Sequence, residues 1–221
     1  MGLPSGVLWS PVNVDDSQPF GFARSPYQYE GSFFSWGNIE AHHPTTEERF
    51  DYNWGGVNTQ APYYEGQPYG LTPGSLIQGN LSLEQDAAHQ ICGGLWRMPS
   101  SDEFQELLDN CMFVDVDGVE IPGEVVDKRI SYPLPDGTGF VVGIRLKSRI
   151  NGAVLFFAAS GDGFGRNWVY RGQKGFYWSS TFSNAQNSNL LSFDNSAVPS
   201  VTLFGRYCGF PIRPVMLIPS E

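Results

Sequence analysis

This chain has few basic side chains: 13 Lys and Arg stand against 23 Asp and Glu in 221 residues, a formal net charge of −10. Because proteins bind phosphate groups through clusters of Lys and Arg, this balance excludes nucleic acid and an anionic membrane surface as partners. No stretch approaches the roughly 18 apolar residues of a membrane-spanning helix, so we expect no membrane insertion. The first residues lack a basic segment followed by an apolar one and therefore predict no signal peptide.

Cysteine is also scarce, with Cys92, Cys111 and Cys208 forming an odd number without CxxC spacing. Such a set predicts free, buried thiols, because an unpaired cysteine behaves as a small apolar side chain. A bridge between Cys92 and Cys111, which lie on or beside neighbouring predicted helices, is the alternative that the sequence leaves open.

The chain has three histidines, of which His42 and His43 are adjacent and His89 is remote. A zinc site needs three or four converging ligands, so we predict no metal site and interpret His42 and His43 as a solvated pair. Residues 115–118 match a fragment of a calcium loop but lack its later glutamate, and they predict a turn. No histidine belongs to a nucleophile–base signature, and no GxSxG, P-loop or Rossmann pattern occurs. We therefore predict no cofactor and no enzymatic activity.

Glycine and proline are abundant, with 26 and 16 residues, beside 41% hydrophobic and 14% aromatic residues. This composition predicts a single folded domain over residues 1–221 with many turns and long connections. Residues 36–80 form an irregular, aromatic-rich insertion. Its aromatic residues predict an ordered loop that packs against itself, and they are Phe50, Tyr52, Trp54, Tyr63, Tyr64 and Tyr69.

Two helices are predicted in the middle of the chain. The first begins with a capping box at Ser82 to Gln85, continues with an apolar stripe and ends at Gly93; the stripe consists of Leu83, Ala87 and Ile91. The second begins with a capping box formed by Ser100 and Glu103. Its apolar stripe consists of Phe104, Leu107, Leu108 and Cys111.

The remainder of the chain has the signals of β-structure. Alternating residues 144–150, a turn at Asn151-Gly152 and residues 153–158 predict one hairpin. Further strands are predicted at 6–14, 176–181 and 210–218, and a second hairpin at 190–194 and 197–204, where Pro199 indicates an edge strand or a bulge. Two helices followed by an antiparallel half predict the α+β class.

Several strings of residues are specific. Residues 94–104 read GLWRMPSSDEF, residues 151–161 begin NG and end AASG, and residues 175–181 read GFYWSST. Residues 206–215 contain RxxGFxxRPV, and the chain opens with LPSG at residue 3, followed by Trp9 and FxWG from Phe34. Arg97 and Arg213 each lie close to a proline in these strings, and we interpret both as structural residues and not as ligand-binding ones. Trp96 and Trp178 are predicted to be buried in the core.

In order and spacing these strings resemble the Fibrobacter succinogenes major paralogous domain family of gut bacteria and their phages. The resemblance implies a C-type-lectin-like fold with two helices and antiparallel sheets, similar to the variable proteins of diversity-generating retroelements and to formylglycine-generating enzymes. In the variable proteins, outward residues near the C-terminus bind the target over a constant framework. The resemblance therefore implies a ligand- or receptor-binding adhesion protein on a virion or an extracellular cell surface, with a protein or glycan receptor as partner.

Strand alternation turns Leu191, Phe193, Val201 and Leu203 inward and their neighbours at 190, 192, 194, 200, 202 and 204 outward. The flanking turns and the preceding loop supply the other predicted binding residues. Exposed aromatic residues and Arg mixed with Asn and Ser are typical of binding surfaces. The predicted ligand-binding residues are Arg166, Asn167, Trp168, Tyr170, Phe182, Asn184, Asn187, Asn189, Leu190, Ser192, Asp194, Ser200, Thr202, Phe204, Tyr207 and Cys208. The alternative that Trp168, Phe182 and Phe204 are core residues stays open.

The sequence leaves two alternatives to adhesion open. One is a structural subunit of a virion or surface assembly, oligomeric or joined to other proteins through the loop at 36–78. The other is a formylglycine-generating-type oxidase, which needs two nearby thiols or a bound copper ion. Cys208 lies in the C-terminal motif, but no second cysteine is close to it in sequence.

Overall fold

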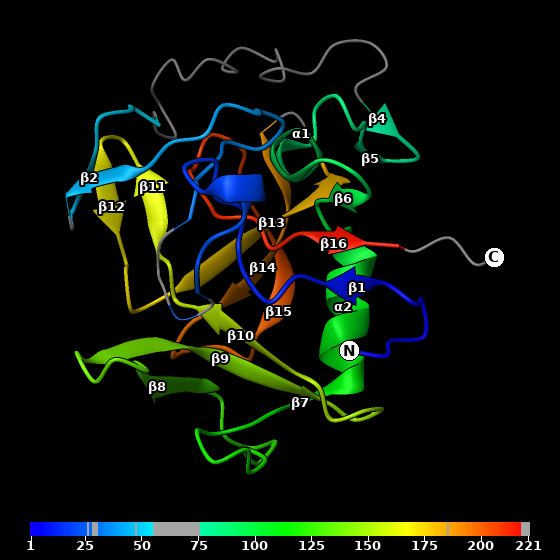
Figure 1. The fold of residues 1–221 in the computed structure, drawn as a ribbon, viewed down its shortest axis with the longest axis vertical. Helices are drawn as coiled ribbons and strands as arrows, with labels where there is room; N and C mark the ends of the chain where they lie inside the picture. Colours follow the sequence, from blue (N-terminus) through cyan, green and yellow to red (C-terminus); the bar gives the residue numbers. More distant parts are fainter. Residues whose placement is uncertain (26, 28–30, 47, 55–75, 185, 218–221) are drawn as a thin grey trace.

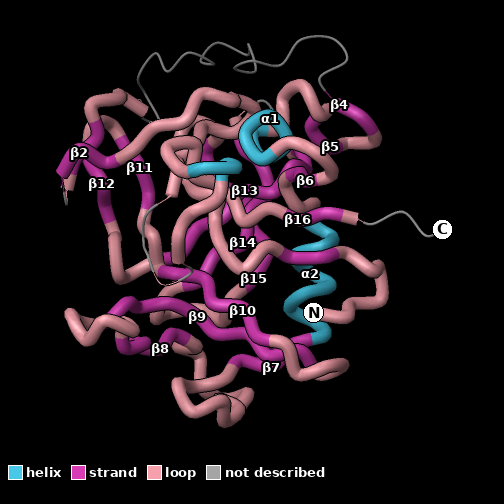
Figure 2. Tube along the Cα trace, in the orientation of Figure 1, coloured by secondary structure: helices cyan, strands magenta, loops and turns pink. Residues whose placement is uncertain are grey.

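The computed structural model describes residues 1–25, 27, 31–46, 48–54, 76–184 and 186–217, which form four small sheets and two α-helices (Figure 1). Every strand pairing in these sheets is antiparallel. Long loops connect the short elements, as the high glycine and proline content predicts (Figure 2). Antiparallel sheets with two helices are consistent with the predicted α+β class.

Helix α1 (Ala87–Cys92) is shorter than predicted, because its N-cap is Asp86 and not Ser82. The Asp86 carboxylate accepts hydrogen bonds from the backbone N–H of His89 at 3.0 Å and of Met98 at 2.8 Å. Residues 82–85 form a turn before the helix, and Leu83 of the predicted stripe is exposed. A buried carboxylate that satisfies two backbone donors outcompetes the serine hydroxyl as the cap. The end at Gly93, where φ is 68°, is as predicted.

Helix α2 (Ser101–Asn110) confirms the prediction for its region. Ser100 and Glu103 form the predicted capping box. Arg97 reaches the same carboxylate with both Nη atoms, at 2.8 and 2.6 Å, and donates to the carbonyl of Met98. Its structural role is therefore confirmed. The stripe faces the interior, with Phe104, Leu107 and Cys111 buried and Leu108 partly buried.

The C-terminal half is organised around a sheet of order β15-β14-β13-β5-β4. Its strands are β4 (Leu76–Ile77), β5 (Asn80–Leu81), β13 (Gly175–Phe182), β14 (Asn187–Phe193) and β15 (Ser200–Gly205). The predicted strand at 176–181 and the predicted second hairpin are confirmed. Pro199 directly precedes β15, which lies at the edge of the sheet, where proline costs no ladder hydrogen bond.

This sheet separates two hydrophobic cores. The first core packs one face of the sheet against α2 and includes Phe104, Leu107, Tyr177, Leu191 and Phe193. The second core packs the other face against N-terminal segments and includes Trp36, Trp178, Leu190, Phe210 and Ile212. The register places Tyr177 opposite Leu191 and Trp178 opposite Leu190, so successive residues of one strand serve different cores.

A second sheet lies at the lower end of the molecule in Figure 1. Its strands are β7 (Cys111–Phe113), β8 (Arg129–Pro133), β9 (Phe140–Ser148) and β10 (Val154–Ala158). The predicted hairpin around Asn151-Gly152 is confirmed, with Val154 opposite Lys147. Gly143 is required here, because a Cβ at this position would lie 2.2 Å from the carbonyl oxygen of Phe157.

The two ends of the chain meet in a third sheet of order β1-β16-β6, formed by β1 (Leu8–Trp9), β16 (Val215–Met216) and β6 (Trp96–Arg97). The strands predicted at 6–14 and 210–218 are therefore much shorter than expected. Pro11, Pro211 and Pro214 lack the N–H that a longer ladder needs. Trp96 is only half-buried and contacts Phe22, which corrects its prediction as a core anchor.

Beyond the short β1–β16 ladder, the side chain of Arg213 links the C-terminal segment to the N-terminal one by hydrogen bonds. Its buried guanidinium donates to Asn13 Oδ1 at 2.8 Å, to the carbonyl of Pro11 at 2.6 Å and to that of Phe156 at 3.0 Å. It also lies over the ring of Phe157, 4.6 Å from the centroid. The predicted structural role of Arg213 is confirmed.

A fourth sheet contains part of the region that was expected to be irregular. It consists of β2 (Pro44–Thr46), β3 (Arg49–Phe50), β11 (Asp162–Phe164) and β12 (Asn167–Val169), with a short helical turn at Pro19–Gly21 elsewhere in the N-terminal region. Phe50, Tyr52 and Trp54 pack against Phe33 and Trp168, so this loop packs onto the rest of the molecule and not only onto itself. The predicted packing of Tyr63, Tyr64 and Tyr69 lies outside the described residues.

Candidate functional site

The predicted binding residues fall into separate groups and do not form one patch. One group lies at the end of the sheet where β13 passes to β14 and β15 ends, a second at the turn between β14 and β15, and a third in the hairpin of β11 and β12 and directly after it. The first two groups are separated by the length of β14, roughly 20 Å at about 3.3 Å per residue. The first group contains Phe182, Asn184, Asn187, Asn189, Phe204 and Tyr207; the second Ser192, Asp194 and Ser200; the third Arg166, Asn167 and Tyr170. Thr202 is exposed in the middle of β15.

Three of the predicted binding residues are buried, which corrects their assignment to the surface. Leu190 and Cys208 are 0% exposed and belong to the second core, and Trp168 is 6% exposed. The indole of Trp168 donates to the carbonyl of Ser160 at 2.7 Å. Leu203, which was expected to pack, is 48% exposed. Strand alternation assigned Leu190 and Leu203 to faces but did not reveal that both faces of the sheet are covered, whereas Trp168 and Cys208 had been placed in a loop and a flanking turn.

The group between β13 and β14 combines aromatic and amide side chains at the end of the sheet. We call it the strand-end surface and define it as Phe182, Asn184, Gln186, Asn187, Phe204 and Tyr207. Its three aromatic residues are half-buried and rest on the second core, whereas Asn184 and Gln186 are exposed. Gln186 was missed from the sequence, because residues 182–189 have no periodicity from which to infer its orientation.

Two of the three rings of the strand-end surface, Phe182 and Phe204, pack on buried aromatic residues beneath them. Phe204 packs on Phe176 and Phe210, with centroid distances of 5.2 and 5.3 Å. Phe182 lies 5.9 Å from the ring of Trp36. The guanidinium of the buried Arg206 lies over both rings, 4.6 Å from the centroid of Trp36 and 5.8 Å from that of Phe182. These two aromatic rings therefore have restricted motion before any partner arrives.

The turn that carries the amides is also fixed. Asn184 Oδ1 accepts hydrogen bonds from the backbone N–H of Gln186 at 3.0 Å and of Asn187 at 2.8 Å. The backbone N–H of Arg206 donates to the carbonyl of Gln186 at 2.9 Å, which ties the turn to the segment after β15. Asparagine is suited to this position because its side chain can cap a turn of its own backbone.

A polar cleft of about 530 Å³ lies elsewhere, between the N-terminal segments and the fourth sheet. Asp15 and His43 line it together with Arg24 and Arg171, so its wall carries groups of both signs. Arg24 is held by a hydrogen bond to Gln18 at 2.5 Å, and Arg171 lies 4.7 Å from the ring centroid of Trp168. The sequence did not predict this cleft, because its residues come from four separate segments.

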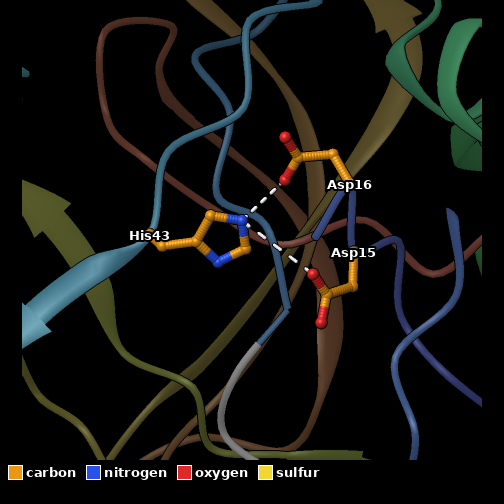
Figure 3. A group of neighbouring side chains, drawn as sticks. All are labelled: Asp15, Asp16 and His43. Atoms are coloured by element: carbon orange, nitrogen blue, oxygen red, sulfur yellow. Dashed lines mark hydrogen bonds and ion pairs between the residues drawn. The ribbon is translucent and has the colours of Figure 1, made fainter. Parts of the chain in front are cut away.

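Beside the cleft, His43 points toward two adjacent carboxylates (Figure 3). Its Nε2 lies 2.6 Å from Asp16 Oδ1 and 3.9 Å from Asp15 Oδ1. Burial raises the pKa of Asp16, but hydrogen bonds from His43 and Ser32 and the charge of His43 outweigh it and bring the pKa below its usual value. The predicted solvated pair is wrong, because His43 is engaged here and His42 stacks on Tyr52 with 3.7 Å between centroids. Burial lowers the pKa of His42.

Ser32 completes a serine, histidine and aspartate set without the geometry of a catalytic triad. Its hydroxyl donates to Asp16 Oδ1 at 2.8 Å and lies 3.4 Å from His43 Nε2. A triad needs the two imidazole nitrogens to face the nucleophile and the acid separately, whereas here the same nitrogen faces both. Ser32 is also fully buried, so its hydroxyl cannot reach a substrate.

A buried carboxylate lies near the C-terminal motif. Asp162 is 3% exposed, and its Oδ1 has no hydrogen-bond partner among the described residues. Burial raises its pKa to about 7 against the opposing charge of Lys174. Burial also raises the pKa of the Cys208 thiol, and the charge of Asp162 adds to this effect. Cys208 is thus held as a neutral thiol, the state in which cysteine is a poor nucleophile.

All three cysteines are free thiols, and Cys92 and Cys111 belong to different cores. Asp115 accepts hydrogen bonds from the backbone N–H of Asp117 and Val119, which confirms a turn. None of the described helices has the length and apolar character needed to cross a membrane.

Comparison of the chain with protein-family models, with curated proteins and with solved structures found no match.

Proposed function

We propose that this chain is a binding protein that attaches to a protein or glycan receptor through its strand-end surface. The observation that carries the proposal is the placement of Phe182, Phe204 and Tyr207, half-exposed at the end of a sheet and fixed by the second core. Rigid aromatic groups supply contact area at low entropic cost, and neighbouring amides adapt their hydrogen bonds to the partner.

None of the six residues of the strand-end surface carries a charge at neutral pH, and this sets the kind of partner. Its six residues are Phe, Tyr, Asn and Gln, so recognition relies on ring stacking and hydrogen bonding and not on ion pairs. A sugar ring offers an apolar face and hydroxyl groups that suit such a surface, and so does an uncharged protein patch. With a net charge of −10, the chain itself does not favour a polyanion.

The C-type-lectin-like fold and a place on a virion or cell surface are part of this proposal. It is supported by three residues of the strings that carry the resemblance, because Trp178, Arg206 and Arg213 are all fully buried. A constant framework beneath a variable surface requires this separation. The oxidase alternative is weakened by the buried, neutral Cys208 and by the free state of all three thiols.

The test is binding of the labelled protein to a glycan array and to intact gut bacterial cells. We expect Tyr207→Ala and Gln186→Arg each to weaken binding at least tenfold, because they remove an anchor or place a charge among the anchors. The matched control is Asn195→Arg, an exposed position at the opposite end of β14. Equal loss in the control, or unchanged binding by both strand-end variants at native stability, would contradict the proposal.

A further inference from the structure

We propose that Asp15, Asp16 and His43 form a binding site for a divalent first-row transition ion, Zn²⁺ or Mn²⁺, at the wall of the polar cleft. One ligand atom of each residue, two carboxylate oxygens and an imidazole nitrogen, lies within 4.8 Å of the other two. His43 approaches from a different segment than the two aspartates, 27 residues further along the chain than Asp16. Three converging ligands are the usual protein contribution to an open metal site.

Backbone pairing holds the three residues in place. The N–H of Ser32 donates to the carbonyl of Val14 at 2.8 Å, which fixes the segment that leads into Asp15. Phe33 and His42 exchange hydrogen bonds of 2.9 and 3.0 Å, which fixes the segment that leads into His43. The site is therefore assembled by the fold and does not depend on ordering a loop when the ion arrives.

The distances are close to those that a bound ion needs. Ligands about 2.1 Å from a tetrahedral ion lie roughly 3.4 Å from one another. His43 Nε2 is 3.9 Å from Asp15 Oδ1 and 2.6 Å from Asp16 Oδ1, and the carboxylate oxygens of Asp15 and Asp16 lie within 4.8 Å of each other, so changes of at most about 1.4 Å suffice. Binding replaces the hydrogen bond between His43 and Asp16 with two metal bonds.

The two adjacent carboxylates make the cluster itself negative, which favours a cation there, although Arg24 and Arg171 line the same cleft. Within the described residues, the ion pairs of the two carboxylates are with His43 alone. Asp15 is 8% exposed and lines the cleft; its Oδ1 accepts hydrogen bonds from the backbone N–H and the hydroxyl of Ser17, whereas among the described residues no group donates to its Oδ2. A largely buried carboxylate beside a second one is costly unless a positive charge compensates it.

The donor set selects the class of ion. Carboxylates alone suit Mg²⁺, Ca²⁺ and Mn²⁺, whereas an imidazole nitrogen shifts the preference toward first-row transition ions. Because Asp15 and His43 line the cleft, the remaining coordination positions of the ion face an open space of about 530 Å³. Water or a ligand in the cleft can fill them. This site is separate from the strand-end surface and does not depend on the function proposed for it.

The experiment is calorimetric titration of the full chain with ZnCl₂ and with MnCl₂, with MgCl₂ and CaCl₂ for comparison. We expect one ion per chain, with affinity for Zn²⁺ or Mn²⁺ at least tenfold above that for Mg²⁺ and Ca²⁺. His43→Gln, Asp16→Asn and Asp15→Asn should each lower the affinity at least tenfold and abolish the rise in Tm that the ion produces in the parent protein.

Two matched controls carry the same changes outside the cluster: His89→Gln on α1 and Asp109→Asn on α2. Affinity retained in these controls and lost in the cluster variants supports the site. Absence of binding by the parent chain, or parent-like affinity in His43→Gln, overturns it. If circular dichroism shows that Asp16→Asn does not fold, Asp15→Asn and His43→Gln decide the outcome. Gln186→Arg at the strand-end surface should bind the ion normally, so failure of one proposal is distinguishable from failure of the other.

Discussion

The two faces of the sheet formed by β13, β14 and β15 are both buried at the centre but differ at the margin. On the face toward α2, the first core covers Tyr177, Leu191 and Phe193 and then gives way to the exposed Leu203. On the opposite face, the second core continues to the strand ends, where Phe182 and Phe204 remain half-exposed. A sheet covered on both sides presents side chains to a partner mainly at its ends. The candidate surface therefore lies at a margin and not across a face.

The largest expected effect tests whether both faces are truly core. Leu190→Ala and Leu191→Ala, adjacent residues on opposite faces, should each lower the free energy of unfolding by about 2–5 kcal/mol, because each leaves a cavity in a packed core. Denaturant titration measures the loss, with the exposed Thr202→Ala of the neighbouring strand expected within about 0.5 kcal/mol of the parent. A loss below about 1 kcal/mol for Leu190→Ala would mean that the second face is only a surface.

A smaller change in stability is expected from Asp162, the buried carboxylate near Cys208 of the second core, and this change depends on pH. The pKa of Asp162 is about 7 in the folded protein and near 3.8 in the unfolded chain. Its contribution to stability is therefore fully present below pH about 4 and is lost as the pH rises through 7, where a charge must be kept buried. Asp162→Asn removes this titration, so the variant should exceed the parent by about 1–3 kcal/mol at pH 8 and by less at pH 5.

Unfolding free energies of both proteins at a series of pH values check this prediction. Asp136→Asn, at an exposed turn, is the control and should keep the parent's pH profile in this range, because hydrogen bonds from Thr138 lower the pKa of Asp136 and leave it ionised throughout. A difference between Asp162→Asn and the parent that does not change with pH would show that Asp162 is hydrated.

The smallest expected loss of stability comes from the N-terminal cap of helix α2, the helix that covers the first-core face of the sheet. Helix α2 is fixed over it by the capping box, so Ser100→Ala should cost about 1 kcal/mol. Ser101→Ala, one residue later, keeps the backbone hydrogen bond from the N–H of residue 101 to Thr181 and should cost less than about 0.5 kcal/mol. Thermal unfolding distinguishes the two, and equal costs would argue against the serine cap as the anchor of this face.

The sequence predicted the elements whose signals are local. The capping box of α2 and the Asn151-Gly152 hairpin depend on residues close together in the chain, and both are confirmed. Alternation also assigned Leu191 and Phe193 correctly to a core. It failed for Leu190 because the second core is supplied by distant residues such as Trp36 and Phe210, which no periodicity reveals.

The candidate sites show the same limit. Asn184, Phe204 and Tyr207 were predicted from composition near the C-terminus, and the structure brings them to one end of the sheet. The pairing of His43 with Asp15 and Asp16 was not predicted, because hydrogen bonds between separate irregular segments bring them together. Residues that meet through long loops leave no spacing pattern in the sequence.

The pairing of β1 with β16 has a mechanical consequence. Leu8 lies opposite Met216 and Trp9 opposite Val215, so the two chain ends leave this short ladder at the same side. Tension applied between the termini would therefore break the β1–β16 hydrogen bonds sequentially, in the unzipping geometry, and would not load all of them at once as in the shear geometry. Arg213, bonded to Asn13 and Phe156, would be the next group to resist. If the protein is tethered by one terminus only and the force acts at another site, the mechanically weak β1–β16 ladder does not carry the load.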